Sequence, residues 1–221
     1  SPTMTSGTTG SVAENAATTT VIYTASATDS ADTTAGVTYS LSGTDAALLN
    51  IDSTSGAVTL KSSANYEGKS SYSFTVSASD GVTTPATQNV VVSVTNLDEV
   101  APSITSGATA TAINENSGAG QTVYTATSTD TTDYVSGSTT YSLKNTGDYS
   151  LLGINATTGA VTLVANPDYE TKNSYSFTVI ATDAAGNASE QAVSLAITNL
   201  DEVSPTMTSG TTGSVAENAA T

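Results

Sequence analysis

The chain has 221 residues and carries 20 acidic side chains against 4 basic ones, so its formal net charge at pH 7 is −16. This charge excludes the basic surface that nucleic acids and anionic membranes require. Because His and Cys are both absent, the sequence also excludes Ser-His-Asp and Cys-His catalysis, disulfide bonds and thiolate metal sites. No run of apolar residues is long enough to span a membrane, and no signal peptide is visible at the start. We therefore expect a soluble fragment whose secretion signal lies outside it.

Short segments of the first hundred residues alternate apolar with small polar residues, which is the period-two pattern of strands. In chain order these segments are 21–27, 37–42, 57–60, 71–78 and 89–96. Turns rich in Gly and Asp separate them, and no helical periodicity is present. About seven short strands in about 100 residues predict an all-β, Ig-like antiparallel β-sandwich. We expect its core to hold the apolar positions of these strands: Tyr23, Tyr39, Leu41, Leu48, Ile51, Val58, Leu60, Tyr72, Phe74, Val76, Val92 and Val94.

The second hundred residues repeat the first. The stretch NYEGKSSYSFTVSASD at 65–80 returns as DYETKNSYSFTVIATD at 168–183, and residues 204–221 are identical to residues 1–18. Tandem self-similarity of this kind indicates an array of similar domains. The predicted domains are repeat 1 at 1–100, repeat 2 at 101–203, and at 204–221 the start of a third repeat that supplies its first strand only.

The acidic residues recur at matching places in the repeats, whereas charges that served solubility alone would drift. The pattern comprises an EN motif, an Asp-x-x-Asp pair, a YE motif, a single Asp after the fourth predicted strand, and the linker TNLDEV, which occurs twice. The carboxylates at these places are Glu14, Glu115, Glu217, Asp29, Asp32, Asp130, Asp133, Glu67, Asp168, Glu170, Asp80, Asp183, Asp98, Glu99, Asp201 and Glu202. Oxygen ligands clustered in this way suit Ca²⁺, whereas Mg²⁺ requires a smaller octahedral site and retains its water.

At these motifs the chain resembles the cadherin repeat family. AEN resembles the acidic motif of that family's first strand, NYE and DYE resemble its second acidic motif, and VSASD and VIATD resemble its Ala-x-Asp motif. NLDEVAP at 96–102 lies where the family has an Asp- and Asn-rich linker that ends in Pro. The chain departs from the family in two places: it has Asp-x-x-Asp in place of Asp-x-Asp, and its linker begins with Asn. These departures affect the number of ions that a site would hold more than the existence of the site.

The resemblance implies that Ca²⁺ binds at the junctions between successive repeats. At the first junction the implied ligands are Glu14, Glu67, Asn96, Asp98, Glu99, Asp130, Asp133 and Asp183. The end of repeat 2 would contribute Glu115, Asp168, Glu170, Asn199, Asp201 and Glu202, and the start of repeat 1 would contribute Asp29, Asp32 and Asp80. Pro102 and Pro205 would stiffen the connections because proline fixes φ.

The composition, rich in Thr, Ala and Ser and free of Cys, is similar to that of the extender regions of giant bacterial adhesins secreted by the RTX, type I route. The resemblance implies a calcium-rigidified spacer at the bacterial cell surface, a monomeric rod-like array that projects a distal binding domain. The alternative is that the repeats themselves adhere to carbohydrate, ice or like copies. An enzyme is disfavoured because the acidic residues recur in every repeat, whereas a glycosidase needs one pair in one cleft.

Overall fold

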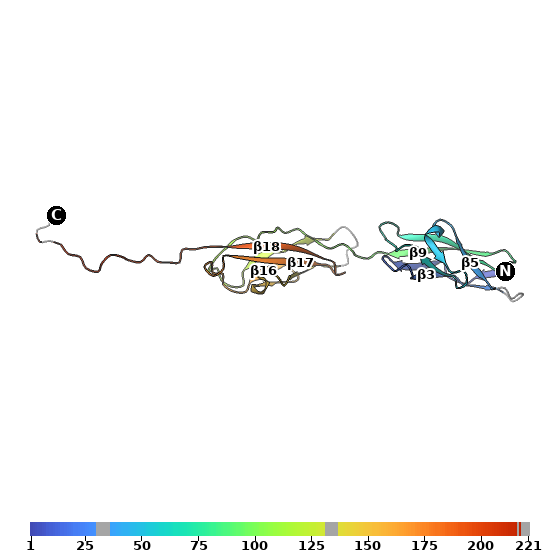
Figure 1. The fold of residues 1–221 in the computed structure, drawn as a ribbon, viewed down its shortest axis with the longest axis horizontal. Helices are drawn as coiled ribbons and strands as arrows, with labels where there is room; N and C mark the ends of the chain where they lie inside the picture. Colours follow the sequence, from blue (N-terminus) through green and yellow to red (C-terminus); the bar gives the residue numbers. More distant parts are fainter. Residues whose placement is uncertain (30–35, 131–136, 216, 218–221) are drawn as a thin grey trace. The chain divides into compact units, whose positions relative to one another are not determined.

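The computed structural model describes residues 1–29, 36–130, 137–215 and 217. The chain divides into two compact units, with the division between Val100 and Ala101. Each unit is a β-sandwich, as the strand pattern predicts (Figure 1). Within the described ranges, no helix combines the length and the apolar character that crossing a membrane requires.

The first unit consists of short strands and one 3₁₀ turn. The strands are β1 (Pro2–Met4), β2 (Thr9–Ala13), β3 (Val21–Thr24), β4 (Ala27–Asp29), β5 (Thr38–Ser42), β6 (Leu49–Ile51), β7 (Ala57–Leu60), β8 (Ser71–Ser79) and β9 (Ala86–Thr95), and the turn η1 spans Ala46–Leu48. One layer is the sheet β2-β9-β8-β5 and the other is β3-β7-β6, while β1 pairs with β4.

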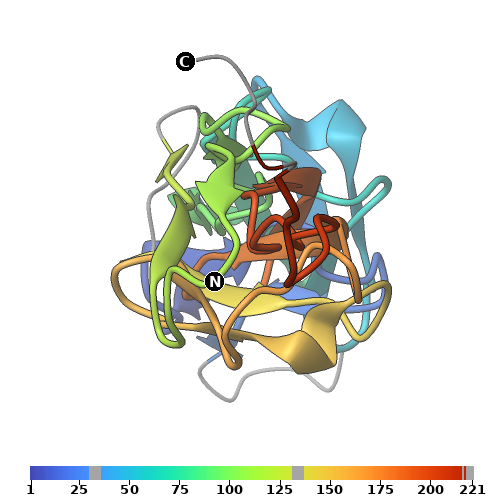
Figure 2. The same cartoon turned by 90° about the vertical axis from the view of Figure 1, so that its left-hand side faces the viewer.

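The second unit repeats this arrangement. Its strands are β10 (Ser103–Ile104), β11 (Ile113–Asn114), β12 (Thr122–Thr125), β13 (Ser128–Thr129), β14 (Thr140–Leu143), β15 (Leu152–Ile154), β16 (Ala160–Leu163), β17 (Ser174–Thr182) and β18 (Ala188–Thr198), with η2 at Tyr149–Leu151. The sheets are β11-β18-β17-β14 and β12-β16-β15, with β10 paired to β13. Figure 2 views the second unit end-on, with β17 and β18 in orange to red and β16 in yellow.

Most strand pairs are antiparallel, but β2 runs parallel to β9 and β11 runs parallel to β18. No hairpin joins the members of these pairs, because the rest of the unit lies between them in sequence. Parallel pairing is therefore possible. The pairing places β2 beside β9 and β11 beside β18, the last strands of their units, so the residues that follow the two paired strands emerge at the same end.

Alternate residues of the long strands form the core of each sandwich. Along β8, Tyr72, Phe74, Val76 and Ala78 are buried while their neighbours face outward. An edge-to-face aromatic pair, with ring centroids 5.9 Å apart, lies in each core: Tyr23 with Phe74, and Tyr124 with Phe177. The two sandwiches thus use the same packing solution.

The expected core is wrong at Leu48. This side chain is 46% exposed, whereas its neighbour Leu49 is 3% exposed and belongs to the core. The 3₁₀ turn η1 ends at Leu48 and β6 begins at Leu49, so the inward-facing position moves by one residue. The other expected core positions are buried or pack against the buried cluster, which also includes Val12 and Ile22.

The strand that pairs in parallel with the last strand of its unit differs in length between the units. β2 pairs with β9 over five residues, whereas β11 pairs with β18 over only two. A Cβ added at Gly10 would lie 2.6 Å from the backbone oxygen of Ile22, so the close approach of β2 requires glycine. Thr111 holds the corresponding place, four residues before Glu115. Before it, an isolated parallel bridge joins Thr109 to Ser194, and the continuous ladder resumes only at Ile113.

Residues 204–215 form no strand and are exposed along their described length. The same sequence forms β1 and β2 in the first unit, where β2 pairs with β9. A strand needs a neighbour to accept its backbone hydrogen bonds. Sequence identity alone therefore does not determine the conformation of this segment.

We predict that Gly10→Ala destabilises the protein by about 1–3 kcal/mol, because the new methyl group must push against the Ile22 carbonyl. Urea unfolding would measure the loss. Gly7→Ala is the matched control, since a Cβ there meets nothing within 4 Å. Equal unfolding midpoints for the two variants would contradict this account of β2.

Candidate metal centre

Glu14 is a buried carboxylate that joins separate segments of the first unit. It directly follows β2 and its side chain is only 2% exposed. Its Oε1 accepts the N–H of Leu97 at 2.6 Å, and its Oε2 accepts the N–H of Tyr66 at 2.9 Å. One side chain therefore holds the YE motif and the linker against the end of β2.

Glu115 does the same in the second unit, where it is 1% exposed. Its Oε1 accepts the N–H of Leu200 at 2.6 Å and its Oε2 accepts the N–H of Tyr169 at 2.9 Å. These two donors, Leu200 first, hold the pKa of Glu115 below its usual value. The folded protein thus keeps this buried group ionised.

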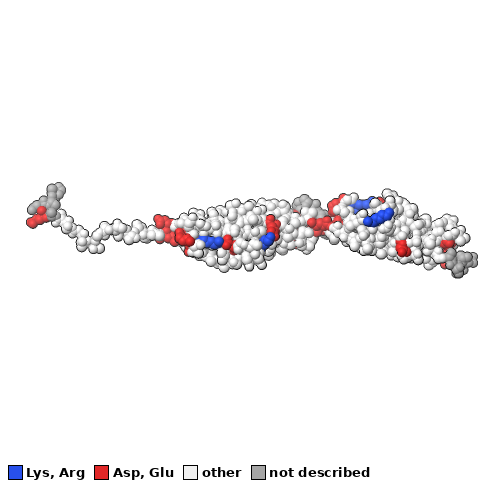
Figure 3. Space-filling model, in the orientation of Figure 1, with Lys and Arg blue, Asp and Glu red and all other residues white. Residues whose placement is uncertain are grey.

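Three carboxylates converge at this end of the second unit. Oxygen atoms of Glu115, Glu170 and Glu202 all lie within 4.8 Å of one another. Asn199 donates its Nδ2–H to Glu170 Oε1 at 3.2 Å. Desolvation and the negative charges of Glu115, Glu170 and Asp168 raise the pKa of Glu202. Figure 3 shows red acidic side chains gathered where the C-terminal segment leaves the sandwich.

The other acidic residues of this end surround the same place. Asp168, Glu170, Asp201 and Glu202, together with Asn199, line a shallow hollow. The backbone and hydroxyl groups of Thr171 donate to Asp168 at 2.9 and 3.0 Å and lower its pKa. The sequence-predicted ligands of repeat 2 are therefore brought together, and the ligand atoms that they offer are carboxylate and amide oxygens.

The opposite end of each sandwich has its own carboxylate. In the first unit Asp80 accepts the N–H of Val82 at 2.9 Å and both the N–H and the hydroxyl of Thr83, at 2.8 and 2.6 Å. These bonds, that of the Thr83 hydroxyl first, lower the pKa of Asp80. The side chain is buried and its carboxylate is fixed within one turn.

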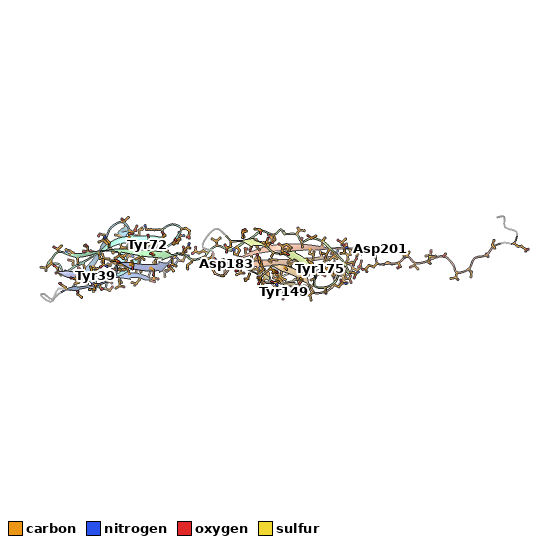
Figure 4. All side chains as sticks on the ribbon, turned by 180° about the vertical axis from the view of Figure 1, so that it is seen from behind. Tyr39, Tyr72, Tyr149, Tyr175, Asp183 and Asp201 are labelled. Carbon is orange, nitrogen blue, oxygen red and sulfur yellow. The ribbon has the colours of Figure 1, made fainter. Side chains whose placement is uncertain are left out.

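Asp183 is the equivalent group of the second unit. It accepts the N–H groups of Gly186 and Asn187 at 2.7 and 2.9 Å, and the Nδ2–H of Asn187 at 3.0 Å. Burial raises its pKa, but these donors outweigh burial and leave the pKa lowered. Figure 4 shows Asp183 and Asp201 at opposite ends of the second unit, so this sandwich has two acidic ends.

The remaining predicted ligands occupy loops and strand ends. Asp29 is the last residue of β4, and its Oδ1 lies 3.3 Å from the amino group of Ser1. Asp130 follows β13 and is half-buried. Glu67 and Glu99 are exposed, Asn96 and Asp98 are half-buried, and Asn96 Oδ1 accepts no hydrogen bond from any residue that the structure describes. Asp32 and Asp133 lie outside the described residues.

The asparagine of the EN motif is a feature that the sequence reasoning missed. Asn15 and Asn116 have positive φ values of 58° and 57°, a conformation that few residues other than glycine adopt. Asn116 also donates its Nδ2–H to Glu202. The sequence signal for this conformation is the recurrence of Asn directly after the Glu of the motif.

A second recurring acidic group has a different partner. Asp45 forms a salt bridge with Lys69 at 2.8 Å and accepts the N–H of Ser73 at 2.7 Å. Asp148 and Lys172 form the same pair at 2.9 Å in the second unit. Burial raises the pKa of Asp45, but the bonds from Lys69 and Ser73 outweigh it and lower the pKa overall. These aspartates therefore bind a lysine and a backbone N–H within their own sandwich, and they do not line the hollow.

A family model and several known proteins match the sequence of this chain. The family model described as Cadherin domain matches residues 8–95 and 109–198. Human Protocadherin Fat 4 is 30% identical over 176 residues, which cover 78% of this chain and 4% of that protein. Mouse Cadherin EGF LAG seven-pass G-type receptor 2 is 34% identical over 173 residues, covering 77% of this chain and 6% of that protein. The chain therefore spans only a small part of these relatives.

Solved structures show the same fold. Human Protocadherin-24 EC1-2 matches with a TM-score of 0.66 and 22% identity, covering 90% of this chain and 98% of that one. Mouse Cadherin-23 EC22-24 matches with a TM-score of 0.63 and 23% identity, covering 91% of this chain and 68% of that one. At this level of identity the likeness concerns the architecture.

The opposite pKa shifts of Glu115 and Glu202 predict opposite effects of neutralising them in calcium-free protein. The lowered pKa of Glu115 stabilises the fold above its ordinary value of 4.5, and this contribution is lost as the pH falls through the folded pKa. The raised pKa of Glu202 favours the fold below 4.5, and this contribution is lost as the pH rises through the folded pKa.

At pH 7 in EDTA we therefore expect Glu115→Gln to lower Tm by several degrees and Glu202→Gln to raise it. Thermal unfolding followed by circular dichroism gives both values. A stabilising Glu115→Gln would show that the backbone donors of Glu115 do not outweigh its burial and the neighbouring charges. A destabilising Glu202→Gln would show that the carboxylates do not repel one another as described.

Proposed function

The chain belongs to the cadherin family, and we propose that its repeats form a calcium-stiffened spacer. The observation that carries this proposal is the convergence of Glu115, Glu170 and Glu202 at the end of a sandwich from which the linker leaves. Like charges this close destabilise the protein unless a cation joins them. A divalent ion would convert the repulsion into attraction.

The donor set favours calcium. The converging side chains are carboxylates and amides, and the sequence offers neither the imidazole nor the thiolate that zinc and copper prefer. Calcium accepts six to eight oxygen ligands in a flexible shell. Bound there, the ion would supply positive charge and coordination bonds between segments that are distant in sequence.

We further propose that ions at each junction are shared between the end of one repeat and the start of the next. The first junction would combine the carboxylates of repeat 1 and its linker with those at the start of repeat 2: Glu14, Glu67, Asp98, Glu99, Asp130, Asp133 and Asp183. Asn96 would add its amide oxygen. Without an ion, each pair of such charges about 4 Å apart costs roughly 1 kcal/mol even in water.

The biological setting in this proposal is an extender region of a bacterial surface adhesin, outside the cell. Its support is compositional: the repeats are similar to one another, free of Cys and poor in aromatic residues. Recognition surfaces are usually richer in Tyr, Trp and Arg. The relatives named above are animal proteins, so they support the cadherin family but not a bacterial origin. The bacterial setting rests on composition alone.

We predict that calcium raises the stability of the protein and narrows its range of shapes. Binding to the folded state alone adds about 2.7 kcal/mol per site at a hundredfold excess over Kd. Extracellular modules usually bind with Kd near 10⁻⁴ to 10⁻³ M, so millimolar calcium should saturate the sites. Calorimetric titration with Ca²⁺ and Mg²⁺ measures the binding, and small-angle scattering measures the distribution of end-to-end distances.

Asp98→Asn combined with Glu99→Gln should reproduce the EDTA scattering profile in saturating calcium. Asp52→Asn is the matched control, because Asp52 accepts the N–H groups of Thr54 and Ser55 at 2.9 and 2.8 Å. Asn155 makes the equivalent bonds in repeat 2, so the control substitution already exists in this fold. Superimposable profiles of the parent protein with and without calcium would refute the spacer mechanism.

A further inference from the structure

A chain of side-chain hydrogen bonds leads to one carboxylate of the candidate metal centre. Gly118 donates its N–H to Asn166 Oδ1 at 2.7 Å, and Asn166 donates its Nδ2–H to Asn116 Oδ1 at 3.1 Å. Asn116 in turn donates its Nδ2–H to Glu202 Oε1. Each side-chain amide thus accepts a hydrogen bond through its oxygen and donates one through its nitrogen, and the last donor of the chain reaches Glu202.

The backbone also fixes Asn116. Its φ of 57° lies in the left-handed region, and its N–H donates to the Pro167 oxygen at 2.9 Å. The backbone at Asn116 is therefore fixed by its own hydrogen bond and by that of its neighbour Glu115, whose N–H donates to the Thr198 oxygen at 3.1 Å. The EN motif would thus supply both a ligand and the support for a second ligand.

The first repeat has the same backbone but lacks the middle of this chain. Asn15 has a φ of 58° and donates its N–H to the Ala64 oxygen at 2.9 Å. Ser63 stands in the place of Asn166, and its hydroxyl donates to the Ala16 oxygen at 2.9 Å. The link from Asn166 to the asparagine of the EN motif therefore has no counterpart at Ser63.

We propose that Asn116 is a positioning residue for Glu202, and that Asn166 holds the Asn116 amide in the orientation that Glu202 requires. This rests on the proposed calcium function. An unsupported glutamate has several rotatable bonds and is repelled by Glu115 and Glu170, so orienting it costs rotamer entropy. A carboxylate can accept from Asn116 while its other lone pairs face an ion. Partners of this kind typically change metal affinity by 10–100-fold.

The test compares Asn116→Gly and Asn166→Ser with the parent chain. Glycine tolerates the positive φ of Asn116, and serine is the residue that repeat 1 has in place of Asn166, so both variants should fold. Asn145→Ser, on the exposed loop after β14, is the control. Amide NMR signals of Tyr169 and Leu200 report calcium at the second repeat, and those of Tyr66 and Leu97 report the first.

We expect Asn116→Gly to weaken calcium binding at Tyr169 and Leu200 about tenfold or more. Asn166→Ser should weaken it to a smaller extent, and Asn145→Ser should have no effect. The signals of Tyr66 and Leu97 should titrate as in the parent in every variant. If Asn116→Gly binds calcium at the second repeat as tightly as the parent does, the positioning role is wrong while the proposed calcium function stands.

A calcium-free measurement separates the two proposals. The Gly118 amide should exchange slowly with solvent in the parent and at least about tenfold faster in Asn166→Ser, because its acceptor is removed. A parent that shows no calcium-dependent signals would refute the proposed function, whatever Gly118 does. A Gly118 amide that exchanges equally fast in the parent and in Asn166→Ser would refute the hydrogen-bond chain itself.

Discussion

The structure depends on one repeated constraint, a buried glutamate directly after β2 and after β11 whose charge is met by backbone N–H groups. Glu14 and Glu115 each accept two such donors, one from the YE motif and one from the linker. A buried carboxylate without donors would cost several kcal/mol. The N–H donors come from segments that carry further carboxylates. In the second unit these segments therefore bring Glu170 and Glu202 close to Glu115.

Periodicity and repetition were enough to predict the fold. The two-residue alternation of β8 and β17 identified both sandwiches because each strand is buried on one face only. The grouping of the acidic motifs of repeat 2 was implied by the resemblance to the cadherin repeat. The structure adds a physical reason, because parallel pairing of β11 with β18 brings the residues after both strands to one end. Recurrence in the repeats singled out Glu115, Glu170 and Glu202 as candidates, and the structure brings their oxygen atoms within 4.8 Å of one another.

Other features depend on contacts that periodicity does not encode. Leu48 lies on a 3₁₀ turn, where the alternation is interrupted and Leu49 takes the inward position. Gly10 has its role because of a carbonyl twelve residues later in sequence. Asp45 recurs as Asp148 just as the proposed ligands recur, yet each pairs with a lysine. Recurrence shows that a charge has a fixed environment, and only the three-dimensional neighbours show whether that environment is a lysine or other carboxylates.

This distinction separates folding from the proposed binding. The cores of the two sandwiches are apolar clusters, and the Asp–Lys pairs brace them without involving the acidic ends. Glu14 and Glu115 are held instead by backbone donors, which remain available whether or not a cation is present. A sandwich built in this way keeps its fold while the charge at its ends stays uncompensated. The linker, attached through the Leu97 and Leu200 N–H groups, is then the segment that a bound cation would affect most directly.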